Sequence, residues 1–201
     1  TTLATTGQIN AAGGGIRIAD SSVTLNRTQF FNNRTPDRGG AIFDMNSGPP
    51  ATLIVNDSHF IASQAADGGA IYTINGVVNI NDTRIHDSRA NTGSGGAIHS
   101  RDGQLTVTGS EIDFGQAFSG KGGAIFSDQQ GGGISSGFVT VIDSRITDSE
   151  ASSGGAIHGN GDTITITGSV IAFNKTVDGD GGALDNVGGI LTISKSQISD
   201  N

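Results

Sequence analysis

Apolar and polar residues alternate in short stretches along the whole chain. VTL, LTV and ITI are three such stretches, and each is followed by two turn-like positions, a serine or threonine, and another apolar residue two positions later. A period of two buries every second side chain of a β-strand, whereas a helix repeats its apolar residues every three or four positions. The pattern therefore predicts an all-β protein built from many short strands.

These strands belong to a repeat. The string Gly-Gly-Ala-Ile, or a variant of it, occurs seven times, with 26, 29, 27, 27, 32 and 27 residues between successive copies. A period of this size indicates a solenoid, a propeller or another array. Four positions of the repeat are apolar in every copy, which favours identical strands stacked coil upon coil. We predict one parallel β-helix domain over residues 1–201, with about seven coils of about 27 residues and three short strands in each.

The four apolar columns are expected to point inward and form the core. They are Ile16, Ile42, Ile71, Ile98, Ile125, Ile157 and Leu184; Val23, Leu53, Val78, Leu105, Val139, Ile164 and Leu191; Leu25, Val55, Ile80, Val107, Val141, Ile166 and Ile193; and Phe30, Phe60, Ile85, Ile112, Ile146, Ile171 and Ile198.

Two further columns predict the corners of the coils. A glycine pair is expected at a sharp corner, where a positive φ or the close approach of stacked backbones excludes a side chain. The hydroxyl column is expected to form a hydrogen-bonded ladder along a second corner, because backbone groups at a bend need partners. The glycine pairs are Gly39 and Gly40, Gly68 and Gly69, Gly95 and Gly96, Gly122 and Gly123, Gly154 and Gly155, and Gly181 and Gly182; the hydroxyl column is Thr28, Ser58, Thr83, Ser110, Ser144, Ser169 and Ser196.

Composition narrows the range of partners. The formal net charge is -8 and no broad basic surface is indicated, which argues against nucleic acid or an anionic membrane surface as the main partner. The chain has no cysteine, and so neither disulfides nor thiolate metal sites. It shows no transmembrane segment and no signal peptide, so we expect any export or anchoring segment to lie outside these residues.

The residue after the inward isoleucine of the glycine strand is often aromatic. Phe43, Tyr72, His99, Phe126 and His158 form this column and are expected to point outward, as a binding stripe for a sugar or a partner protein. The alternative is that long loops fold over this face and bury Phe43 and Phe126. A shared metal ion is not expected, because His99 and His158 lie two coils apart, about 10 Å by strand spacing.

Carboxylates suggest two weaker sites. Asp57 and Asp82 share one corner in adjacent coils, and Asp178 and Asp180 lie in a glycine-rich turn; either pair offers the oxygen ligands that calcium prefers. The first pair also reads as ordinary Asx turns. No other cofactor is expected.

An outward column of alternating charge contains Arg84, Glu111 and Arg145 and is interpreted as a surface ladder. Outward threonines, such as Thr106, Thr140 and Thr165, would suit ice binding, although Ile54, Asn79 and Ile142 interrupt their columns. The three lysines, Lys121, Lys175 and Lys195, lie in different columns, so no cluster typical of a polysaccharide lyase or hydrolase is predicted.

The repeats GGAI, FFNN at residues 30–33 and IAFN at residues 171–174 resemble the GGA[ILV] and FxxN repeats of the chlamydial polymorphic membrane proteins. Similar repeats occur in many bacterial surface proteins with pectin-lyase-like parallel β-helices. The resemblance implies a right-handed helix, an exported autotransporter-type passenger or surface protein, and a role in adhesion. The partner would be a protein or glycan on a host or neighbouring cell.

We therefore expect a non-enzymatic, secreted or cell-surface segment that acts in adhesion or as a structural filament. The alternatives are a carbohydrate-active enzyme on the same helix and an ice-binding β-solenoid. The last repeat matches the interior ones and shows no cap, which predicts either a segment of a longer protein or end-to-end stacking of copies.

Overall fold

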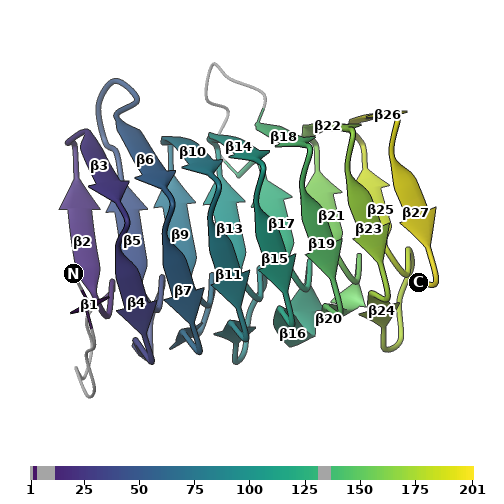
Figure 1. The fold of residues 1–201 in the computed structure, drawn as a ribbon, viewed down its shortest axis with the longest axis horizontal. Coiled ribbons are helices and arrows are strands. Elements are labelled where there is room, and N and C mark those ends of the chain that lie inside the picture. The colour runs from purple at the N-terminus through teal and green to yellow at the C-terminus, as the bar shows by residue number, and fades with distance from the viewer. Residues whose placement is uncertain (1, 4–11, 131–136) are drawn as a thin grey trace.

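The computed structural model describes residues 2–3, 12–130 and 137–201. Its strands form four parallel sheets that run along a solenoid of about seven coils (Figure 1). Three of the sheets receive a strand from each coil, whereas the fourth has only five strands, and strands pair with the equivalent strands of neighbouring coils. The predicted all-β parallel solenoid is confirmed.

Sheet 1 contains the strands that follow the glycine pairs, and sheet 2 contains the alternating strands. Sheet 1 is β2 (Ile16–Ala19), β5 (Ile42–Met45), β9 (Ile71–Ile74), β13 (Ile98–Arg101), β17 (Ile125–Asp128), β21 (Ile157–Asn160) and β25 (Leu184–Val187). Sheet 2 is β3 (Val23–Asn26), β6 (Thr52–Asn56), β10 (Val77–Asn81), β14 (Gln104–Thr108), β18 (Phe138–Ile142), β22 (Thr163–Thr167) and β26 (Ile190–Ser194).

Sheets 3 and 4 complete each coil. Sheet 3 is β1 (Thr2–Leu3), β4 (Gln29–Phe31), β7 (His59–Ile61), β11 (Arg84–His86), β15 (Glu111–Asp113), β19 (Arg145–Thr147), β23 (Val170–Ala172) and β27 (Gln197–Ser199). Sheet 4 is β8 (Gln64–Ala65), β12 (Arg89–Ala90), β16 (Gln116–Lys121), β20 (Glu150–Ser153) and β24 (Lys175–Thr176).

Sheet 4 is an addition to the predicted three strands per coil. It lies in the segment before the glycine pair, which varies in length from coil to coil. Ala90, Ala117 and Ala151 stack there in a small apolar cluster of their own. These methyl groups pack in register in successive coils, beside the backbone pairing of the short strands.

The four predicted inward columns form the main core. The strand register places each apolar residue beside the equivalent apolar residue of the next coil, as with Ile98 and Ile125, and with Leu105 and Val139. In the interior coils these side chains are at most 1 % exposed, and Phe30 stacks on Phe60 with ring centroids 4.5 Å apart. The same columns are more open in the last coil, where Ile193 is 40 % exposed. Burial in this core therefore depends on a neighbouring coil on each side.

Both explanations for the glycine pair apply, one to each glycine. Gly95 and its equivalents have positive φ, between 58° and 75° across the coils. At Gly96, a Cβ would collide with the Gly123 carbonyl of the next coil. The first glycine therefore provides the turn and the second allows the backbones to stack.

The hydroxyl column forms the predicted ladder. The Ser110 amide donates to Ser144 Oγ at 3.1 Å, the Ser144 amide donates to Ser169 Oγ at 3.1 Å, and the same bond links the other neighbours from Thr28 to Ser196. Each hydroxyl in turn donates to the carbonyl two residues before it, as Ser144 does to Ile142 at 2.7 Å. These bonds satisfy the backbone groups that the corner leaves outside the strand ladder.

Within the part of the chain that the structure describes, no helix has the length and apolar character needed to cross a membrane.

Candidate functional site

The aromatic column of sheet 1 points outward, as predicted, but it is not exposed. Tyr72 and His158 are 0 % exposed, His99 is 4 %, Phe43 is 6 % and Phe126 is 9 %. The rings follow one another along the solenoid, with centroids 4.4–5.8 Å apart. The alternative prediction is confirmed in that this face is buried, but the covering contacts among the described residues come from the segment before the glycine pair and not from a long loop. The expected exposure of the stripe is corrected.

The covering contacts come from the segment before the glycine pair. The Arg38 guanidinium lies 5.1 Å from the Tyr72 ring centroid, and Asp67 Oδ1 lies 3.6 Å from His99 Nδ1. On the neighbouring strand β17, Asp128 Oδ1 lies 3.0 Å from His99 Nε2. This side of sheet 1 is therefore a second packed layer, and a ligand cannot reach its rings while the layer is closed.

Electrostatics reflect this burial. Burial raises the pKa of Tyr72 to about 12. For Asp67, burial would raise the pKa, but the His99 imidazole 3.6 Å away and a hydrogen bond from the Ser94 amide hold the pKa below its usual value. Burial lowers the pKa of His158, and Lys121 acts in the same direction against the opposing Asp185. The layer thus favours a neutral His158.

The predicted carboxylate pairs stay at the surface corners. Asp57 and Asp82 occupy equivalent positions in adjacent coils with φ of 48° and 47°, which agrees with the turn interpretation. Asp178 and Asp180 lie between β24 and β25, and the Asp180 carbonyl accepts a hydrogen bond from the Gly154 amide. Across residues 2–3, 12–130 and 137–201, no group of three or more His, Cys, Asp or Glu residues could hold a metal ion. Calcium at either pair therefore stays a prediction.

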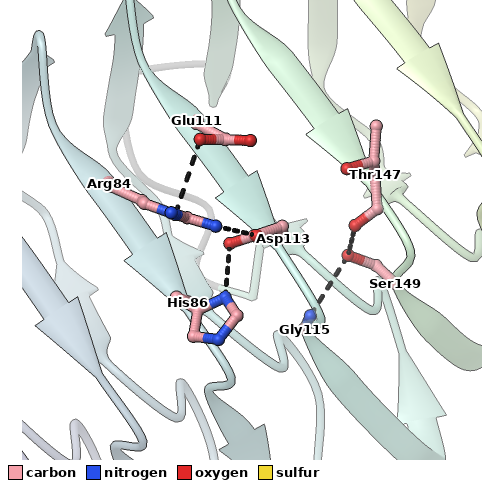
Figure 2. Close-up of polar contacts among 7 residues, drawn as sticks. All are labelled: Arg84, His86, Glu111, Asp113, Gly115, Thr147 and Ser149. Atoms are coloured by element: carbon pink, nitrogen blue, oxygen red, sulfur yellow. Dashed lines mark hydrogen bonds and ion pairs between the residues drawn. The ribbon is translucent and has the colours of Figure 1, made fainter.

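The outer face of sheet 3 differs, because it combines charged, imidazole and aromatic groups at the surface. Arg84 and His86 lie on β11, and Glu111 and Asp113 lie on β15, all with outward side chains. We call these four residues the sheet 3 cluster (Figure 2). Strand register places Arg84 beside Glu111 and His86 beside Asp113.

Asp113 organises the sheet 3 cluster. Its side chain is only 4 % exposed, and it receives Arg84 Nη2 at 2.6 Å on one oxygen and His86 Nδ1 at 3.0 Å on the other (Figure 2). Arg84 also pairs through Nε with Glu111 at 3.4 Å. The hydrogen bond to Asp113 raises the pKa of Arg84, so the guanidinium stays charged. A buried carboxylate with two fixed partners holds both basic groups in one orientation.

The corner after Asp113 is also fixed. The Gly115 amide donates to Ser149 Oγ at 3.2 Å, and Ser149 Oγ donates to the Thr147 carbonyl at 3.2 Å (Figure 2). Phe114, which lies between Asp113 and Gly115 in the sequence, adopts a positive φ of 54° and is 45 % exposed. The His86 ring meets Phe114 edge to face, with centroids 5.4 Å apart.

A small hollow opens beside the sheet 3 cluster. It has a volume of about 110 Å³ and is lined by His59, Phe60, Ile61, Arg84 and His86. Phe31, on the neighbouring strand β4, is 51 % exposed and pairs in register with Ile61. The hollow therefore lies between exposed aromatic rings and is open to a group carried by a partner molecule.

Sequence reasoning found part of this site. It placed Arg84 and Glu111 in one outward column, and their ion pair confirms the predicted contact. It missed His86 and Asp113, although the repeat also aligns them in adjacent coils, one column further on. Their alignment was the available signal; the burial of Asp113 was not visible in the pattern.

Fold and surface together define a non-globular repeat protein, a parallel β-solenoid with one covered and one open polar face. Comparison of the chain with protein-family models, with curated proteins and with solved structures found no match.

Proposed function

We propose that this chain is a non-enzymatic, extracellular binding scaffold that acts in adhesion, with the outer face of sheet 3 as its docking surface. The observation that carries the proposal is the sheet 3 cluster, in which a buried Asp113 fixes Arg84 and His86 beside exposed aromatic rings. Arginine and aromatic side chains are enriched at the centres of protein interfaces.

The solenoid itself supports the same role. Its strands keep the same register from coil to coil around the sheet 3 cluster, and the four side chains make contacts with one another that hold their positions. A rigid surface of this kind loses little conformational entropy when a partner docks. The resemblance to bacterial surface repeats supports a location outside the cell.

The test is binding of the fluorescently labelled chain to intact cells, compared with a polysaccharide-cleavage screen on the same preparation. We expect saturable binding that Arg84→Gln weakens at least tenfold, with Arg145→Gln as the matched control from the same outward column. Depolymerisation of any polysaccharide at enzymatic rates would contradict the proposal, as would cell binding that the Arg84 substitution leaves unchanged.

A further inference from the structure

The polar side chains that line the hollow beside the sheet 3 cluster are all of one charge type. Its three polar lining side chains, His59, Arg84 and His86, are all basic types. The two acids of the cluster, Glu111 and Asp113, lie on the next strand, β15, behind Arg84 as seen from the hollow. No acidic side chain lines the hollow itself, so a carboxylate placed there would meet only basic types among its polar neighbours.

Arg84 and His86 have nitrogen atoms that do not contact Glu111 or Asp113 and could contact a ligand in the hollow. A guanidinium has five N–H donors, and Arg84 uses Nε toward Glu111 and Nη2 toward Asp113, which leaves Nη1. A carboxylate is an acceptor, so His86 donates from Nδ1 to Asp113, and its Nε2 can donate to a ligand carboxylate only when the ring is doubly protonated. Asp113 therefore fixes the Arg84 guanidinium and the His86 imidazole, and the nitrogens that contact neither acid remain available to a ligand.

Size limits what can enter. Ligand pockets for whole small molecules usually measure about 300–1,000 Å³. The hollow measures about 110 Å³, and the outward side chain of Ile61 supplies its apolar wall. These dimensions suit one short acidic side chain, whose methylene groups would pack on the apolar wall while its oxygens meet Arg84.

The surroundings favour a protein as the carrier of that side chain. Phe31 lies on the strand beyond Ile61, and Phe114 lies beyond His86, so exposed rings border the hollow on both sides along the solenoid axis. Apolar side chains on a bound segment would cover these rings and exclude water from the ion pair, which strengthens it.

We propose that the hollow lined by His59, Arg84 and His86 receives the carboxylate side chain of an aspartate or glutamate from an acidic segment of a partner protein. The proposal rests on the proposed docking role of sheet 3 and names the chemistry of its ligand. Phe31 and Phe114 are the flanking contacts for apolar residues of the same segment.

The experiment is an NMR titration of the whole chain with a blocked peptide that carries one glutamate between two leucines. We expect amide shift changes that are largest at His59, Ile61 and Arg84. The matched glutamine peptide should bind at least tenfold more weakly. Arg84→Gln should abolish the shifts in a variant whose thermal melting shows that it is folded, while Arg145→Gln should leave them unchanged.

Three results would overturn the inference. These are equal binding of the glutamate and glutamine peptides, equal or tighter binding of glucuronate or inorganic phosphate, and shifts that lie elsewhere on the solenoid. Failure here is distinguishable from failure of the proposed function. If labelled chain still binds cells but the glutamate peptide does not bind the hollow, only the ligand assignment is wrong; if the chain binds no cells, the adhesion role is wrong.

Discussion

Sheets 1 and 3 both carry aromatic and charged side chains on their outer faces, yet the two faces differ. On sheet 1 the rings from Phe43 to His158 contact one another in tilted or edge-to-face arrangements and are covered, and Tyr72 is 0 % exposed. On sheet 3, Phe31 is 51 % and Phe114 is 45 % exposed, and a hollow lies between them. Alternation along a strand specifies which side of the sheet a residue occupies; it does not specify whether another segment covers that side.

The cover explains the difference. In two coils the residue before the glycine pair lies against the outer side of sheet 1: Arg38 meets Tyr72, and Asp67 meets His99. Aromatic residues outside the main core thus perform two roles in one protein: stabilising a second layer on sheet 1, and presenting a surface on sheet 3. The following predictions test that division, from the largest expected effect to the smallest.

We expect the largest loss of folding stability from a substitution in one of the inward core columns. Ile125→Asp should unfold the central coils, because it places a carboxylate in a fully buried apolar position, at a cost of about 4 kcal/mol or more. Circular dichroism during thermal melting is the measurement. A variant that keeps the melting temperature of the wild type would show that the inward register is wrong.

Tyr72 should behave as a core residue although it points outward. Tyr72→Ala is expected to lower the free energy of unfolding by about 3–5 kcal/mol in chemical denaturation. Phe173→Ala, at a ring that is 53 % exposed, is the control and should change it by no more than about 0.5 kcal/mol. Equal effects at the two sites would remove the distinction between the faces.

The covered face should also be sensitive to acid. Because the pKa of His158 is lowered in the folded state, the unfolded chain binds more protons as the pH falls below about 6.5. This contribution to stability is complete above that pH and is lost as the pH decreases toward the folded pKa. Chemical denaturation at pH 7.5 and 5.5 should therefore show a smaller acid-induced loss for His158→Phe than for wild type. An identical loss in both proteins would contradict the burial of a neutral imidazole.

The smallest effect concerns the exposed corner of sheet 3. Phe173 has a φ of 58° at a corner where other coils place Asn32 or Asp148. Asparagine tolerates this conformation better than phenylalanine does, so Phe173→Asn should raise the free energy of unfolding by about 0.5 kcal/mol. Asp148→Phe should lower it by a similar amount. A loss of stability in Phe173→Asn would mean that the exposed ring packs more than its exposure indicates.

Much of the fold follows from the sequence because stacked coils repeat their constraints. The apolar columns, the glycine pairs and the hydroxyl ladder each recur in a fixed register, so one alignment predicts contacts such as that between Ser110 and Ser144. The sheet 1 cover and the burial of Asp113 arise from segments of variable length and from contacts between different columns. The repeat aligns His86 with Asp113, but no period along the chain encodes the cover of sheet 1 or the burial of Asp113.

The four histidines of the chain offer the most direct test of the difference between the two faces. His59 and His86 line the hollow on sheet 3, whereas His99 and His158 are covered on sheet 1. Brief treatment of the native protein with diethyl pyrocarbonate, read out by peptide mass spectrometry, reports the accessibility of all four in one sample. The account predicts rapid modification of His59 and His86, and modification of His99 and His158 at least tenfold slower until the protein is unfolded. Modification of His99 or His158 as fast as that of His59 would contradict it.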